Sequence, residues 1–127
     1  MKKKAIIISI KGYRLSINEK NLLANERPWG LILFKRNIKS LRQVKKLIKK
    51  IRKLTKDSKF PIMIDEEGSP VSRLKEIINH NFSQKSLGDI YKINKEVSLL
   101  FYKDYINNLT NFLKKIGINI NTVPVLD

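Results

Sequence analysis

Residues 60–74, FPIMIDEEGSPVSRL, combine a short apolar run with three consecutive acids, Asp65, Glu66 and Glu67. The chain has eleven acids and a formal charge of +16, so more than a quarter of its acids stand at three adjacent positions. Acids that directly follow a buried strand are typical of a binding site, whereas acids on a helix face are typical of a solvated surface. The flanking sequence therefore has to show whether residues 61–64 form a strand.

Strand and helix signals alternate along the chain on both sides of this stretch. Apolar runs of strand length occur at residues 5–10, 30–34, 61–64 and 118–126. Between the first two runs, Ser16 is followed three residues later by Glu19, a capping-box pattern that predicts a helix to about residue 26.

Two longer helices are predicted in the rest of the chain. The first follows the run at 30–34, has apolar positions that repeat every 3.6 residues, and has Asn37 or Ser40 as its predicted N-cap. The second covers residues 97–116, with Gly117 at the position of a C-cap glycine. The segment between them that follows the third strand, residues 66–94, contains glycine and proline and is predicted to be irregular.

This order of elements indicates an α/β protein with a parallel sheet and outer helices. The uninterrupted apolar strands predict that both faces of the sheet are covered. An open doubly wound sheet and part of a (β/α)8 barrel both fit, and in both the sites lie at the carboxyl ends of the strands. Asp65 and Asp127 would then lie at the functional edge. Neither a glycine-rich dinucleotide turn after the first strand nor a phosphate-binding loop is present in the sequence.

The amino-acid composition excludes several kinds of functional site. With 127 residues the chain is expected to form one domain. It has no cysteine and a single histidine, His80, so disulfides, thiolate chemistry and a metal site of several histidines from this chain alone are excluded. His80 lies in a polar stretch and is interpreted as a surface or structural residue, and no cofactor is expected. The apolar runs are too short for a secretory core or a membrane span, so a cytoplasmic location is expected.

The high positive charge allows two interpretations. Lysine supplies 21 of the 27 basic residues, they are spread along the whole chain, and their densest run lies on the polar side of the helix expected after residue 40. A solvated basic surface is one interpretation, and a face that binds polyanions is the other. A basic α/β module that binds nucleic acid or an anionic membrane is therefore kept as the alternative function.

Three motifs stand in order along the chain: GLILFKRN at 30–37, IDEEG at 64–68 with Val71 and Arg73, and GI at 117–118 followed by PVLD at 124–127. Together they resemble glycoside hydrolase family 3, in particular its single-domain bacterial β-N-acetylhexosaminidases. The resemblance implies that residues 1–127 are the truncated N-terminal portion of a TIM-type (β/α)8 barrel, with about four β/α units. It also implies hydrolysis of terminal β-linked N-acetylglucosamine by a retaining glycosidase of peptidoglycan recycling.

The same resemblance assigns roles to residues in the acidic stretch. It implies that Asp65 hydrogen-bonds hydroxyls of the terminal sugar and that Arg73 reaches the same sugar. Chemistry agrees, because a carboxylate accepts two O–H bonds and a guanidinium supplies a rigid fork of donors. The alternative is an internal Asp65–Arg73 pair that pins the loop. We expect Glu67 to anchor this loop and Glu66 to face solvent.

Two aromatic residues flank the second strand. Trp29 and Phe34 are expected in the core, although an aromatic ring near the mouth of a barrel could stack on a sugar.

No catalytic residue is expected within this chain. The resemblance places the nucleophile and the acid/base C-terminal to Asp127, and a full barrel needs about 250 residues. The chain alone is therefore expected to be inactive and to bind only part of a carbohydrate substrate, an N-acetylglucosamine-containing muropeptide or chito-oligosaccharide. A homodimer or a complementing C-terminal half is the expected protein partner, and no specific nucleic acid is expected. A small doubly wound domain, complete in itself and of unknown ligand, is the remaining hypothesis.

Overall fold

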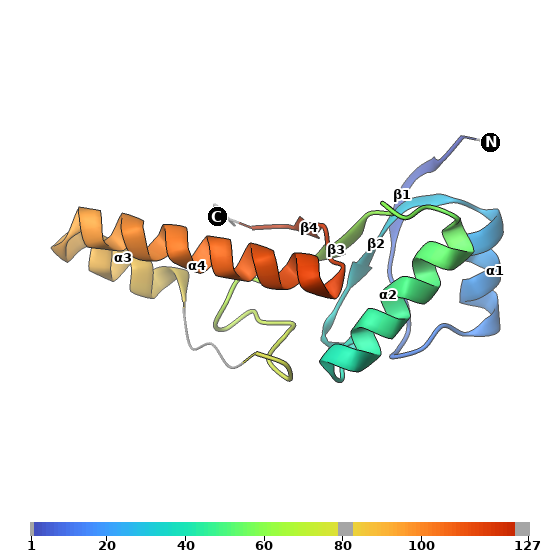
Figure 1. The fold of residues 1–127 in the computed structure, drawn as a ribbon, viewed down its shortest axis with the longest axis horizontal. Coiled ribbons are helices and arrows are strands. Elements are labelled where there is room, and N and C mark those ends of the chain that lie inside the picture. Colours follow the sequence, from blue (N-terminus) through green and yellow to red (C-terminus); the bar gives the residue numbers. More distant parts are fainter. Residues whose placement is uncertain (1, 79–82, 124–127) are drawn as a thin grey trace.

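A computed structural model describes residues 2–78 and 83–123, which form a parallel sheet with the strand order β1-β2-β3-β4 (Figure 1). The strands are β1 (Lys4–Ile8), β2 (Pro28–Leu33), β3 (Ile62–Ile64) and β4 (Ile120–Asn121). The helices are α1 (Ile17–Asn25), α2 (Leu41–Thr55), α3 (Gln84–Ile93) and α4 (Lys95–Ile116), with a single 3-10 turn η1 (Lys35–Asn37) after β2. The predicted α/β class and parallel strands are confirmed.

The strands lie where the apolar runs predicted them, with shifted ends. The second strand begins at Pro28, two residues before its expected start. The last strand was expected over residues 118–126 but is only Ile120–Asn121 within the described residues, and residues 124–127 lie outside them. Pairing of Leu31 with Ile62 and of Leu33 with Ile64 fixes the register of the two central strands.

Polar caps define the ends of the helices. The Ser16 hydroxyl accepts from the N–H of Glu19 at 3.2 Å, and the Glu19 carboxylate accepts from the N–H of Ser16 at 2.7 Å, so the predicted capping box is confirmed. Ser40, and not Asn37, caps α2. Gly117 ends α4 with φ of +105°, a conformation that glycine adopts without a Cβ clash.

The prediction that residues 66–94 are irregular is wrong for α3. Ser83 caps this helix by accepting from the N–H of Ser86 at 3.1 Å, and Lys85 and Asp89 form an (i, i+4) ion pair at 2.8 Å. Gly88, which suggested a break, lies within the helix. None of the described residues of α3 is buried, because it packs on α4 and not on the sheet.

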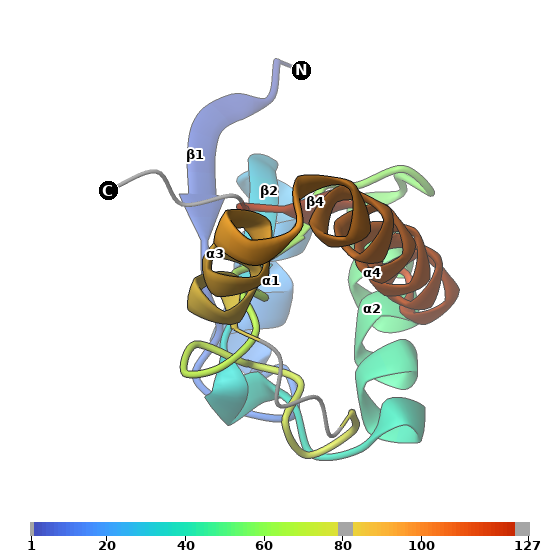
Figure 2. The same ribbon diagram turned by 90° about the vertical axis from the view of Figure 1, so that its left-hand side faces the viewer.

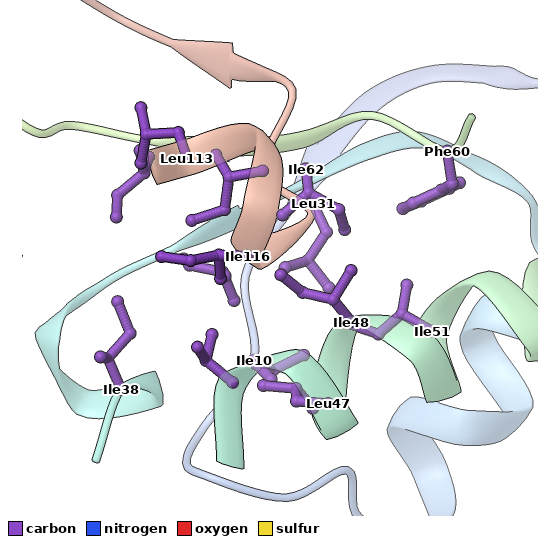
Figure 3. Close-up of a cluster of buried hydrophobic side chains, with 14 of the residues drawn as sticks. Ile10, Leu31, Ile38, Leu47, Ile48, Ile51, Phe60, Ile62, Leu113 and Ile116 are labelled. Atoms are coloured by element: carbon purple, nitrogen blue, oxygen red, sulfur yellow. The ribbon is translucent and has the colours of Figure 1, made fainter. Parts of the chain in front are cut away.

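The hydrophobic core lies between the sheet and helices α2 and α4. Figure 3 shows Ile48 and Ile51 of α2 and Ile116 of α4 pointing toward Leu31 and Ile62 of the two central strands. These five side chains are almost completely buried, so the apolar period of α2 does face the sheet as predicted. This packing holds both helices at fixed positions relative to the strands.

One edge of the molecule is not covered as the sequence predicted. Strand β1 pairs only with β2 within the described sheet, and its Ile6 and Ile7 are 51% and 43% exposed. The expectation that both faces of the sheet are buried is therefore wrong for β1, because no described helix packs over it at these residues. An apolar run can indicate a strand, but it does not show what covers it.

Helices α3 and α4 extend beyond the sheet as an antiparallel pair, at the opposite end of the molecule from α1 (Figures 1 and 2). The first half of α4 exposes Leu99, Leu100 and Phe101, whereas its last turns bury Leu113 and Ile116 in the core. In the described ranges, no helix is both long enough and apolar enough to cross a membrane.

Gly30 provides a test of how closely β2 and β3 approach. A Cβ atom added at Gly30 would lie 3.0 Å from Cβ and 3.2 Å from the carbonyl oxygen of Pro61. We predict that Gly30→Ala lowers the free energy of unfolding by about 1–3 kcal/mol in denaturant titrations, because the paired backbones must shift. Gly12 is the matched control, since an added Cβ there meets nothing within 4 Å. Equal effects of Gly30→Ala and Gly12→Ala would contradict the close approach.

Candidate functional site

Polar and aromatic side chains gather where the strands end. Ser9, Phe34, Asp65 and Thr122 follow β1, β2, β3 and β4 within one or two residues of the last strand residue. Because the strands are parallel, their carboxyl ends meet at one edge of the sheet, where sites of parallel α/β proteins lie. The structure thus places Asp65 at the edge at which the sequence predicted it.

Asp65 contacts Arg73 and Thr122. Its Oδ1 accepts from the Thr122 hydroxyl at 2.6 Å, and its Oδ2 lies 3.6 Å from Nη2 of Arg73. The side chains of Asp65 and Arg73 are 24% and 31% exposed. The predicted proximity of the two residues is confirmed. They form the internal pair that was considered as an alternative, and both still reach solvent.

A second arginine extends this arrangement toward β1. The Arg36 guanidinium lies 4.6 Å from the centre of the Phe34 ring, and that of Arg73 lies 5.9 Å from the same ring. Arg36 also donates to the carbonyl of Ile10 at 3.1 Å and to the hydroxyl of Ser9 at 3.0 Å. Hydrogen bonds, an ion pair and cation–π contacts to the Phe34 ring therefore connect the four strand ends. Arg36 and Thr122 had no assigned role from sequence, and only their positions after strands could have indicated one.

Glu66 has the opposite role from the one predicted. It is completely buried, and its Oε2 accepts from the backbone N–H groups of Arg73 at 2.8 Å and Leu74 at 2.9 Å. Glu66, which was expected in solvent, therefore anchors the loop, a role that was assigned to Glu67. Burial, together with the nearby Glu66 carboxylate, raises the pKa of Tyr105 on α4. The error arose because adjacent acids in an irregular segment carry no periodic signal for which of them points inward.

Two asparagines hold β3 in place. Asn119 accepts from the N–H of Ile62 at 2.7 Å, and Asn121 accepts from the N–H of Glu66 at 3.0 Å. The Asn121 amide also donates back to the Glu66 carbonyl at 3.1 Å. These side chains extend the pairing beyond the two residues of β4. The alternation of isoleucine and asparagine in 118–121 is the sequence signal that could have revealed them.

The two aromatic residues that were predicted to lie in the core, Trp29 and Phe34, do not lie there. Trp29 is 41% exposed, so its assignment to the core is wrong, because it lies on the outward side of β2. Phe34 is only partly buried and lies against the two arginines, not within the core cluster. His80 and Asp127 lie outside the described residues.

The arrangement suits binding of a polar ligand with several hydroxyl groups. A carboxylate acceptor, guanidinium donors, a hydroxyl and an aromatic face together match the hydroxyls and C–H faces of a polyhydroxylated molecule. Within the described residues, Asp65 is held by Thr122 and Arg73, and an arginine does not exchange protons in proteins. In the same residues, no three histidine, cysteine or acidic side chains are grouped to hold a metal ion.

Comparisons with known proteins show which proteins the chain is similar to. No family model matches the chain. A β-hexosaminidase from Idiomarina loihiensis is 35% identical over 124 residues, which are 96% of this chain and 36% of the relative. The crystal structure of NagZ from Neisseria gonorrhoeae in complex with N-trifluoroacetyl-D-glucosamine superposes with a TM-score of 0.86 at 28% identity, over 98% of this chain and 37% of NagZ.

A third similarity names the family itself. A glycoside hydrolase family 3 β-N-acetylglucosaminidase from Paenibacillus has a TM-score of 0.77 and 26% identity, over 93% of this chain and 22% of that protein. The resemblance to the β-hexosaminidases of glycoside hydrolase family 3 is confirmed. The chain spans about a third of the length of the curated relatives that it matches, 36% and 37% for those from Idiomarina loihiensis and Xanthomonas campestris.

The loop anchor can be tested with a nearly isosteric change. We predict that Glu66→Gln lowers the free energy of unfolding by about 1–3 kcal/mol, because a buried charged acceptor of two backbone N–H groups is replaced by an amide. Hydrogen exchange should become faster at the amides of Arg73 and Leu74. The matched control is Glu67→Gln, which makes the same chemical change at the neighbouring position. If both variants gave the same stability and exchange rates, Glu66 would not be the anchor.

Proposed function

We propose that this chain contributes part of the sugar-binding site of a glycoside hydrolase family 3 enzyme that removes terminal β-linked N-acetylglucosamine. The observation that carries the proposal is the pairing of Asp65 with Arg73 at the carboxyl edge of the sheet, with both side chains partly open to solvent. The similarity to NagZ, whose crystal structure holds an N-acylglucosamine analogue, supports this ligand class.

The acceptor positions that stay available on the Asp65 carboxylate support the binding of a sugar there. One carboxylate oxygen accepts from Thr122 and the other faces Arg73 at 3.6 Å, which is longer than a hydrogen bond. Each oxygen has two lone pairs, so acceptor positions stay available for two vicinal hydroxyls. The 3.6 Å separation leaves Arg73 able to donate to a ligand oxygen while it stays close to the carboxylate. Both would thus hold one sugar ring without transferring protons.

The fold we propose for the whole protein is a (β/α)8 barrel, with residues 1–127 as its N-terminal portion of about four β/α units. The parallel order β1-β2-β3-β4 and the exposed β1 support this, because in a closed barrel an edge strand would have a second neighbour. Pairing with a complementing C-terminal half or a second copy, a role in peptidoglycan recycling and a cytoplasmic location are further parts of the proposal.

A binding experiment tests the sugar site directly. We predict that methyl N-acetyl-β-glucosaminide shifts the amide NMR signals of Asp65, Arg73 and Thr122 in the 127-residue chain. Asp65→Asn should weaken the shifts, because it replaces two charged acceptors with a mixed amide. Asp89→Asn is the matched control, since Asp89 pairs with Lys85 on the surface of α3. Shifts that are absent, or that are equally strong in Asp65→Asn, would contradict the proposal.

The proposed absence of the catalytic residues from this part of the enzyme leads to a prediction for catalysis. We predict that the 127-residue chain releases no aryl alcohol from an aryl N-acetyl-β-glucosaminide, because a retaining glycosidase needs both a nucleophile and an acid/base. The assay is absorbance of the released aryl group, with an active family member as the positive control. Turnover that co-purifies with the chain and is abolished by Asp65→Ala would show that catalytic residues lie within this chain.

A further inference from the structure

A basic hollow lies between the second half of α2 and the C-terminal end of α4, with a volume of about 790 Å³. The helix that follows a parallel strand runs back along the sheet, so the end of α2 lies away from the carboxyl edge that holds Asp65. The link between the two helices is the bond from Arg52 Nη2 to the carbonyl of Gly117, at 2.7 Å. The basic side chains that line the hollow are Lys45, Lys49, Arg52, Lys53, Lys56, Lys114 and Lys115.

Within the described residues, neighbouring acids neutralise only a small part of the positive charge of this hollow. Asp57 is the single acid among the residues that line it, and its carboxylate already accepts from Lys3 at 2.7 Å and from the N–H of Lys59 at 2.9 Å. Among residues 2–78 and 83–123, none of the seven basic side chains forms an ion pair with a carboxylate. The buried Nε of Arg52 also has no hydrogen-bond partner in this part of the chain.

Helix capping explains only a small part of this charge. Both α2 and α4 end at the hollow, and basic residues in a last turn interact favourably with the C-terminal end of a helix. Two helix ends together carry the equivalent of about one negative charge. Together with Asp57 they offset about two of the seven positive charges, so about five stay unbalanced.

We propose that this hollow binds the phosphate backbone of a nucleic acid without reading its sequence. Lysines and an arginine that surround a concave surface can contact successive phosphates, and neutralised phosphates release counterions. None of the described residues that line the hollow is aromatic, so base stacking is not expected to contribute and the binding should be independent of sequence.

A membrane surface fits this hollow less well than a nucleic acid. Helices that bind bilayers insert an apolar face next to their basic face. Here the apolar side chains at the hollow, Ile48 and Ile116, are buried in the core and cannot insert.

The test is fluorescence anisotropy of a labelled 20-nucleotide oligo-dT with the full 127-residue chain at several salt concentrations. The test variant combines Lys49→Gln, Lys53→Gln and Lys114→Gln, which change three exposed residues that line the hollow. The matched control combines Lys75→Gln, Lys92→Gln and Lys103→Gln, which remove the same charge from exposed positions outside the hollow. Circular dichroism confirms that both variants keep the helix content of the native chain.

We expect the test variant to bind about tenfold or more weakly at 50 mM salt, while the control stays within about threefold of the native chain. The slope of log K against log salt should fall by about two, since each phosphate contact on a single strand contributes about 0.7. Equal weakening in both triple variants would overturn the proposal and indicate diffuse net charge. Absence of oligonucleotide binding at 50 mM salt would also overturn the proposal. It would equally be overturned if the test variant lost binding to anionic vesicles of phosphatidylserine but kept binding to the oligonucleotide.

Discussion

Glu66 is fully buried, and its carboxylate accepts hydrogen bonds from the backbone N–H groups of Arg73 and Leu74. A buried charge is tolerated only where strong partners replace water, and two backbone donors meet this condition. The bond to Arg73 fixes the backbone from which the Arg73 side chain extends toward Asp65. Leu74, which is also completely buried, attaches the same loop to the core. The geometry of the proposed sugar site therefore depends on an acid that is itself buried away from any ligand.

Side-chain amides also join neighbouring segments along the carboxyl edge of the sheet. Asn37 is buried and donates to the carbonyls of Ile10 and Gly12 while it accepts from the N–H of Phe34, which joins the segment after β1 to the turn after β2. Asn119 and Asn121 join β3 to β4 in the same way. The short strands β3 and β4 leave several backbone groups without ladder partners, and these amides satisfy them. Side-chain hydrogen bonds thus connect segments along this edge, although its regular strands are short.

Much of the fold could be predicted from local signals. The capping box at Ser16 and Glu19, the C-cap glycine Gly117 and the apolar face of α2 each depend on short-range chemistry and were predicted correctly. The depth of Glu66, the helix α3 and the exposure of β1 could not be predicted, because each depends on which distant element packs there. For the site, the sequence indicated Asp65 and Arg73, but Arg36 and Thr122 become visible only when the four strand ends are brought together. Likewise, the sequence does not show that the basic residues of α2 lie next to Lys114 and Lys115 of α4.

The central claim is that Asp65 and Arg73 hold the terminal sugar and do not transfer protons. The most direct measurement is kcat/KM for an aryl N-acetyl-β-glucosaminide, across pH, in an active chimaera that joins this chain to the remaining residues of the Idiomarina loihiensis β-hexosaminidase. We predict that Asp65→Asn and Arg73→Lys each lower kcat/KM by about ten- to several-hundred-fold, leave the pH profile in place, and are less than additive when combined. An unchanged kcat/KM, or a limb of the pH profile that moves by about one unit, would contradict the central claim.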